Sequence, residues 1–214
     1  MNSSNTGLKI ISVEVADLRV PTSDTLMGSD PFHKKPNYSC VYTQIKLSNG
    51  IEGNSVGFTV GAGNDWIVYG VKDIAKLLEN YSFDKFIDDP GATYKFINDH
   101  HQLRWLADGV GRMAMGSIIN SLWDAWAKIE EKPMWKLLVD LEPEKVIASI
   151  DWRYLKDALS KSEALEILKE KEADHKDLES ALRDKGPKAY STAGWRGLTD
   201  EEIVRTVREM QSNG

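Results

Sequence analysis

Hydrophobic and polar residues alternate from Leu8 to Val60, which is the pattern of β-strands with one buried face. The alternation runs through three segments, 8–20, 38–47 and 51–60. Between the last two segments, Ser48-Asn-Gly50 is a hairpin signal. The pattern therefore predicts an antiparallel meander of three strands.

A long segment, 22–36, joins the first two predicted strands and is rich in Gly, Ser, Asp and Pro. Loops of about 15 residues within compact domains are commonly binding loops or lids. We therefore expect this segment to be a binding loop, with a floppy surface loop as the alternative interpretation.

After Asn64 the hydrophobic residues recur at helical spacing. Helices are expected over 64–78, 83–98, 110–130 and 133–138. Asn64 is expected to cap the first of these, and Pro90-Gly91 should break the second. The helix over 110–130 carries a broad apolar stripe, so it is expected to be the centre of the core.

Beyond Pro143 the pattern becomes that of a strand followed by helices. The run Val146-Ile-Ala-Ser-Ile150 is short and apolar, which suits a buried parallel strand. Charged helices are expected over 162–171, 175–185 and 199–212. No internal repeat is visible. The predicted fold class is an α+β domain with a strand-then-helix segment after it.

Composition narrows the classes of function. Hydrophobic residues make up 41% of the 214 residues and the formal net charge is -6, so we expect a globular protein without affinity for nucleic acid. The single cysteine, Cys40, excludes an internal disulfide and is expected to be a small buried residue. No apolar run is long enough for a membrane span, and residues 1–7 do not resemble a signal peptide. A cytoplasmic location is the default expectation, and a mitochondrial one stays open.

Three motifs combine residue types that also occur in functional sites. Gly61-Ala-Gly63 stands between a strand and a helix like a phosphate-binding turn, but it lacks the third glycine of that motif. His100 and His101 are expected to form a solvated helix end, since adjacent helical residues point about 100° apart and do not readily share a metal ion. Asp124, between two tryptophans, is expected to be a structural anchor and not a catalytic acid.

Two further motifs leave both interpretations open. Asp151-Trp-Arg-Tyr154 follows the predicted parallel strand, where it could line a site or close the end of the strand. Trp195 and Arg196, between glycines, could form a stacking surface or a packed loop anchor.

Several strings, many of which contain tryptophan, occur together in one order and approximate spacing. They are Val20-Pro-Thr-Ser23, Gly28-Ser-Asp30, Asn37-Tyr-Ser39, Phe58-Thr-Val-Gly-Ala-Gly63, Gln102-Leu-Arg-Trp105, Asn120-Ser-Leu-Trp-Asp-Ala-Trp-Ala-Lys128, Lys132-Pro-Met-Trp-Lys-Leu-Leu138, Asp151-Trp-Arg-Tyr154, and Ala189-Tyr-Ser-Thr192 with Gly194-Trp195. In this combination the chain resembles the N-terminal portion of L-fuconate dehydratases, in the mandelate racemase-like branch of the enolase superfamily. The resemblance extends over residues 8–212.

The resemblance implies an α+β capping domain over residues 1–142, followed over 143–214 by the first strand and helices of an incomplete TIM-type barrel. It implies a Mg²⁺-dependent dehydration of an acid sugar to a 2-keto-3-deoxy sugar acid. A base removes the proton next to the carboxylate, the metal stabilises the enediolate, and an acid assists the departure of hydroxide. By position, the family's substrate-contacting cap residues correspond to Gly28, Ser29, Asp30 and Tyr38. Ser29 replaces a small apolar residue, and the insert 32–35 also departs from the family pattern.

The family's acid and base groups and its metal ligands lie on later barrel strands than this chain includes. The resemblance therefore assigns no catalytic residue and no Mg²⁺ ligand to residues 1–214, and the chain alone is predicted to be inactive. Three interpretations stay open. The chain is the N-terminal part of a dehydratase, a cap subunit that works with a separate barrel chain or as a homo-oligomer, or a non-catalytic module that binds acid sugars.

Overall fold

The computed structural model describes residues 7–26, 28–106, 108–186, 194–195 and 197–213. Its strands β1 (Ile10–Val20), β2 (Tyr38–Leu47) and β3 (Glu52–Thr59) form one antiparallel sheet in the order β1-β2-β3. Val15 pairs with Thr43 across β1 and β2, and Thr43 pairs with Ser55 across β2 and β3. The predicted meander is confirmed.

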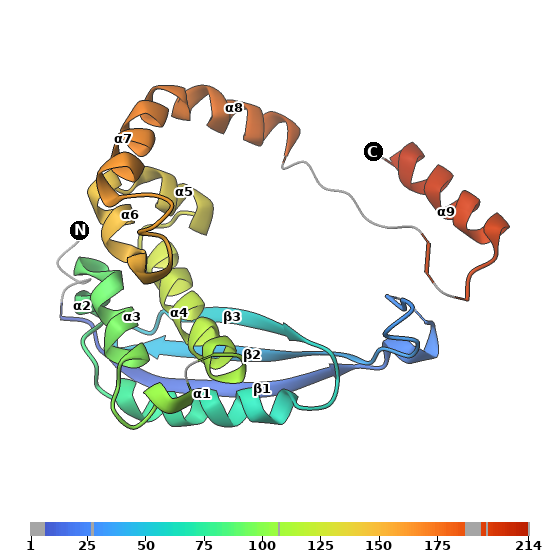
Figure 1. The fold of residues 1–214 in the computed structure, drawn as a ribbon, viewed down its shortest axis with the longest axis horizontal. Helices are drawn as coiled ribbons and strands as arrows, with labels where there is room; N and C mark the ends of the chain where they lie inside the picture. Colours follow the sequence, from blue (N-terminus) through green and yellow to red (C-terminus); the bar gives the residue numbers. More distant parts are fainter. Residues whose placement is uncertain (1–6, 27, 107, 187–193, 196, 214) are drawn as a thin grey trace.

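One face of the sheet packs against helices α1 (Asn64–Leu78) and α4 (Val110–Ile129) (Figure 1). Successive side chains of a strand point to opposite faces, and in β2 Val41, Thr43 and Ile45 are fully buried while the residues between them are partly exposed. The stripe expected on α4 is buried at Met115, Ile118, Leu122 and Trp126. The core therefore lies between this face of the sheet and the two helices.

Small residues bring α4 unusually close to β3. The buried residues Ser117, Ser121 and Ala125 follow one another at intervals of four along α4. The Ser55 hydroxyl donates to the backbone oxygen of Ser117 over 2.6 Å. A Cβ placed on Gly53 would lie 2.0 Å from the backbone oxygen of Ser121, so only glycine fits at this point of β3.

The helix expected over 83–98 is divided at Pro90, as predicted, into α2 (Phe83–Asp88) and α3 (Pro90–Asn98). Proline is favoured in the first turn of a helix, where its missing N–H would have no partner. The carboxylate of Asp89 caps α3 by accepting from the Ala92 amide over 2.8 Å.

The parallel strand predicted at 146–150 is wrong, because this segment forms helix α6 (Pro143–Ser149). Pro143 occupies the first turn, and Pro143 and Ile147 are buried four residues apart on one helical face. A short apolar run suits either a buried strand or a helix turn, so the run alone did not distinguish them. The described residues contain no strand outside the meander, and the motif segment Ala189–Thr192 lies outside them.

Past α4 the regular elements of the described residues are helices. Besides α6 they are α5 (Met134–Asp140), α7 (Lys161–Lys171), α8 (His175–Lys185) and α9 (Asp200–Asn213), with short 3-10 turns at Trp152–Tyr154 and Glu172–Asp174. Two more 3-10 turns, Thr22–Asp24 and Arg104–Leu106, precede α4. Capping boxes start α7 at Ser160 and α9 at Thr199. None of the described helices is both long and apolar enough to cross a membrane.

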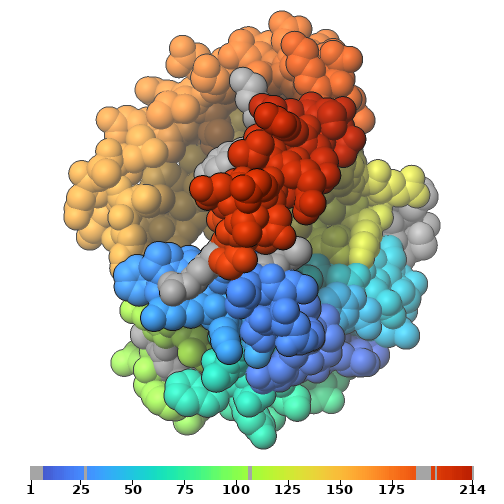
Figure 2. Space-filling view, turned by 90° about the vertical axis from the view of Figure 1, so that its right-hand side faces the viewer, coloured from blue at the N-terminus to red at the C-terminus, as the bar shows by residue number. Residues whose placement is uncertain are grey.

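Helices α5 to α8 form an arch beside the sheet, and α9 stands apart from it (Figure 1). Seen end-on, α9 lies next to the loop that joins β1 and β2 (Figure 2). Gly197, just before α9, is so close to Leu26 of this loop that an added Cβ would lie 2.5 Å from the Leu26 Cδ1. The division into domains at residue 142 stays a prediction, since α6 also packs against α3.

Candidate functional site

The loop between β1 and β2, residues 22–36, is closed at its base by hydrogen bonds. The Thr22 hydroxyl donates to the Pro36 backbone oxygen over 2.8 Å and accepts from the Tyr38 amide over 3.0 Å. The Ser23 hydroxyl donates to the Asn37 side-chain oxygen over 2.5 Å. These bonds fix the two ends of the loop on neighbouring strands, so its tip is held at one end of the sheet.

Gly28 of this loop and Tyr38, the first residue of β2, contact each other directly. The Tyr38 hydroxyl donates to the Gly28 backbone oxygen over 2.9 Å, and the Tyr38 ring packs edge-on against Phe58. Gly28 has a φ of +76°, and a Cβ there would lie 1.9 Å from the Tyr38 Oη. Glycine is therefore required by the backbone conformation and by the space that Tyr38 occupies.

Ser29 and Asp30 follow in the same loop. Ser29 is buried, and its amide donates to the Leu26 backbone oxygen over 3.0 Å. Asp30 Oδ1 accepts from the amides of Phe32 and His33 over 2.7 and 2.6 Å, and Oδ2 lies 3.2 Å from His33 Nδ1. Three residues of the predicted substrate site, Gly28, Ser29 and Asp30, thus lie in the loop, while Tyr38 begins β2 and reaches Gly28 by its hydroxyl. The Asp30 carboxylate holds the turn that follows it.

Acid is expected to loosen this turn. Hydrogen bonds from His33 and then Phe32 lower the pKa of Asp30, so its carboxylate stabilises the loop at neutral pH. That contribution is present above the unfolded pKa of roughly 3.9 and is lost as the pH falls through the lowered pKa of the folded state. In an NMR titration, the Phe32 and His33 amide signals should report the Asp30 carboxyl by a transition with a midpoint below the free value of roughly 3.9. The transition should be missing in Asp30→Asn; a midpoint at or above the free value would contradict this role.

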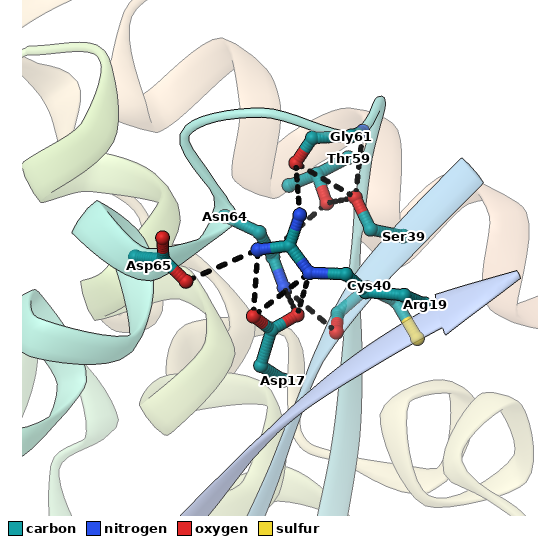
Figure 3. Close-up of polar contacts among 8 residues, drawn as sticks. All are labelled: Asp17, Arg19, Ser39, Cys40, Thr59, Gly61, Asn64 and Asp65. Atoms are coloured by element: carbon teal, nitrogen blue, oxygen red, sulfur yellow. Dashed lines mark hydrogen bonds and ion pairs between the residues drawn. The ribbon is translucent and has the colours of Figure 1, made fainter. Parts of the chain in front are cut away.

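A polar network joins β1 to the turn before α1, next to the base of the loop (Figure 3). The Arg19 guanidinium donates to the carboxylates of Asp17 and Asp65 over 2.7 and 3.1 Å, and to the Gly61 backbone oxygen over 3.2 Å. Arg19, and then Asn64, lower the pKa of Asp17. The network therefore ties the edge strand β1 to the start of α1, the helix that packs against the same face of the sheet.

Asn64 lies at the centre of this network and is almost completely buried. Its Nδ2 donates to Asp17 Oδ1 over 2.5 Å and to the Cys40 backbone oxygen over 3.2 Å, and its Oδ1 accepts from Thr59 over 2.7 Å. The expectation that Asn64 caps α1 is wrong: Gly63 occupies the cap position, and the Asn64 side chain binds across the sheet instead. Cys40 itself is half-buried and not fully buried as expected.

The Gly61–Gly63 turn is also held from inside the protein. The Gly61 amide donates to the Ser39 hydroxyl over 2.8 Å, and Ser39 in turn contacts the Thr59 hydroxyl at 2.6 Å. The first amide of the turn is therefore occupied and cannot bind a phosphate. This geometry favours a structural role for the turn.

The other candidate motifs take structural positions. Asp124 accepts from the Asn54 amide over 2.7 Å and pairs with Lys128, as an anchor between α4 and β3. His100 and His101 have ring centroids 4.7 Å apart, and no group of metal-binding side chains occurs among the described residues.

The motif at 151–154 closes the end of α6. Arg153 forms a forked ion pair with Asp151 and a second pair with Asp99, and the Trp152 indole donates to the Ile147 backbone oxygen over 2.8 Å. Arg153 lowers the pKa of Asp151. Trp195 is half-buried, and Arg196 lies outside the described residues.

Comparison with known proteins gives the family. No family model matches the chain. Mitochondrial enolase superfamily member 1 of Xenopus laevis is 33% identical over 211 residues, 96% of this chain and 47% of the relative. An L-galactonate dehydratase of Hypocrea jecorina is 34% identical over 202 residues, 92% of this chain and 45% of the relative. The solved structure of human mitochondrial enolase superfamily member 1 matches with a TM-score of 0.91 at 34% identity, over 96% of this chain and 48% of that one. The chain belongs to the enolase superfamily.

This enolase-superfamily chain spans about half the length of the curated relatives it matches. An enolase from Bradyrhizobium, solved with magnesium and mandelic acid, shares the fold at 17% identity with a TM-score of 0.51, over 96% of this chain and 52% of that one. The predicted α+β cap with its three-stranded meander is confirmed, apart from the strand expected at 146–150, and the relatives at 33–34% identity show the superfamily. L-fuconate as the substrate stays a prediction.

Proposed function

We propose that this chain is the cap-forming part of a sugar-acid dehydratase similar to L-fuconate dehydratase, and that its 22–36 loop closes over the acid sugar. Gly28, Ser29, Asp30 and Tyr38 would contact the substrate. The observation that carries the proposal is the 34% identity to an L-galactonate dehydratase over 92% of the chain. The loop supports it, because a hydrogen bond joins Tyr38 to Gly28, and further bonds fold the backbone at Ser29 and Asp30.

In such a reaction a bound Mg²⁺ supplies the positive charge that stabilises an enediolate. The described residues gather no group of three or more His, Cys, Asp or Glu side chains that could hold a metal ion. In this proposal the described residues bind and orient the substrate and exclude water from it.

Residues 1–214 are therefore expected to bind L-fuconate without dehydrating it. When the chain is supplied with Mg²⁺ and L-fuconate, it should form no 2-keto-3-deoxy product. Isothermal titration should show that L-fuconate binds weakly to the chain. Tyr38→Phe should weaken that binding about tenfold, since one hydrogen bond that shapes the loop is lost.

Tyr42→Phe is the matched control, because Tyr42 lies on the same strand and its hydroxyl donates to Asn54, away from the loop. Binding to this variant should be unchanged. Turnover by the unassisted chain, or equal losses in both tyrosine variants, would contradict the proposal.

The intact mass of the polypeptide made from its natural locus adds an independent test: a mass near twice 24.0 kDa supports a dehydratase with cap and barrel in one chain.

One observation favours a second candidate, a cap subunit completed by a separate barrel chain. The α9 side chains Val204, Val207 and Met210 are between 37% and 47% exposed, and an amphipathic helix of this kind gains its stability from packing. This candidate would be supported over the first if the polypeptide made from the natural locus has a mass of 24.0 kDa and a barrel-only chain co-purifies with it.

A further inference from the structure

A pocket of about 550 Å³ opens between the second half of the 22–36 loop and the end of the sheet. Its walls come from the end of β1, from residues 32–38 and from the turn at 60–62. Gly28, Ser29 and Asp30 do not line it. Tyr38 is shared by the pocket and the proposed substrate site, because it lines the pocket and also donates to the Gly28 backbone oxygen.

The charged side chains that line this pocket are all basic. They are Arg19, Lys34 and Lys35, together with His33, and no acidic residue lines it. Arg19 is already paired with Asp17 and Asp65, and His33 contacts Asp30. Lys34 and Lys35 form no ion pair with any described residue, so they are the cations available to a ligand.

This positive region stands out because the chain as a whole carries a formal net charge of -6. Two neighbouring lysines that lack counter-ions raise the local concentration of small anions. Apolar side chains complete the wall: Phe32 is 93% exposed, and Val20 and Val60 are also exposed. Such a combination suits a ligand with an anionic group attached to a carbon chain.

We propose that this pocket binds a second anionic group of the substrate, so that the acid sugars taken by the cap carry negative charge at both ends. The proposal rests on the proposed function, since it places the rest of the substrate at the adjoining Gly28–Tyr38 contact. A terminal carboxylate and a terminal phosphate share this chemistry. Both would accept hydrogen bonds from the Lys34 and Lys35 ammonium groups.

Titration of the full chain with three ligands tests the inference: L-fuconate with one anionic group, galactarate with two carboxylates, and 6-phosphogluconate with a carboxylate and a phosphate. One or both doubly anionic ligands should bind at least about tenfold more tightly than L-fuconate at low salt, and the advantage should shrink as salt is raised. The tighter of the two identifies the anionic group. Lys34→Ala/Lys35→Ala should remove this advantage and change L-fuconate binding less than about twofold.

Lys9→Ala/Lys46→Ala is the control, because it removes the same charge from exposed residues at the opposite end of the sheet. Equal losses in both double variants would mean that only net charge matters and would overturn the inference. So would L-fuconate binding with no preference for two anionic groups, which would leave the proposed function standing. A third outcome separates the two proposals. If 6-phosphogluconate and inorganic phosphate bind through Lys34 and Lys35 but L-fuconate and galactarate do not bind, the anion site is supported and the proposed function is overturned.

Discussion

Replacing Gly53 by alanine is expected to destabilise the fold by about 3 kcal/mol, a fall of roughly 6–12 °C in Tm. The new Cβ would lie 2.0 Å from the Ser121 backbone oxygen and 2.7 Å from the Ala125 Cβ. Neither atom can turn aside, because one belongs to the backbone of α4 and the other is bonded directly to it. The helix must therefore move away from β3, which strains the hydrogen bond from Ser55 to Ser117. Thermal unfolding followed by circular dichroism measures the effect.

Gly57→Ala provides the comparison within the same strand. A Cβ on Gly57 would meet only Val41, at 3.9 Å, which is an ordinary contact. Alanine also lowers the entropy of the unfolded chain, so this variant should keep the native stability or gain up to about 1 kcal/mol. Equal Tm values for the two variants would show that the close approach of α4 to β3 does not support the fold.

This contact illustrates what the sequence could and could not predict. The strands followed from alternation that is local to each segment, and the apolar stripe of α4 followed from helical spacing. The closer contact depends on Ser117 and Ser121, which a hydrophobic pattern counts as polar. Their spacing of four residues was a usable signal for a small-residue face, but nothing in it named β3 as the partner. Pairings between distant segments are set by packing and not by local pattern.

The segment after Pro143 shows a limit of a different kind. Val146–Ile150 is apolar enough for a buried strand, and the resemblance to a barrel enzyme favoured that interpretation. The deciding feature was Pro143, whose fixed φ suits the first turn of a helix and whose missing N–H costs nothing there. Capping and start signals therefore carried more information than the hydrophobicity of five residues.

The candidate site was predicted in part. The loop's length and composition predicted a binding loop, with a floppy surface loop as the alternative, and the resemblance selected Gly28, Ser29, Asp30 and Tyr38; both stay predictions. The network behind the loop was missed, because Asp17 and Arg19 contact residues more than forty positions away. A signal existed: two charged residues at alternate positions of a strand must share one face of the sheet. Their partners on α1 and in the glycine turn became evident only in the folded chain.

Replacing Asn64 by aspartate is expected to cost about 3–5 kcal/mol at pH 7, since a buried amide would become a buried carboxylate without a counter-ion. The amide donates to Asp17 and to the Cys40 backbone oxygen. An aspartate oxygen in its place can only accept, so it would face two other acceptors. Asn64 is 1% exposed, and water cannot screen the repulsion. Urea unfolding at pH 7 measures this loss.

The pH dependence separates repulsion from a simple packing defect. In the native chain the lowered pKa of Asp17 means that its carboxylate stabilises the fold at neutral pH and that this contribution is lost in acid. In Asn64→Asp the facing carboxylates raise each other's pKa, so protonation of one relieves the strain as the pH falls from 7 toward roughly 4. The difference in unfolding free energy between variant and native chain should shrink over that range. A constant difference would mean that charge is not the cause.

Asp17→Asn/Asn64→Asp exchanges the amide and the carboxylate between the two positions, and so restores one donor opposite one acceptor. The double variant is expected to be more stable than Asn64→Asp alone by about 1–3 kcal/mol, because contacting residues in one hydrogen-bond network are not additive. Asp65 still pairs with Arg19 in this variant, so the guanidinium keeps one of its two carboxylates. Asp17→Asn alone completes the comparison. If the double variant loses the sum of what the two single variants lose, the Asp17–Asn64 contact contributes nothing to stability, and Arg19 alone holds β1 to the turn before α1.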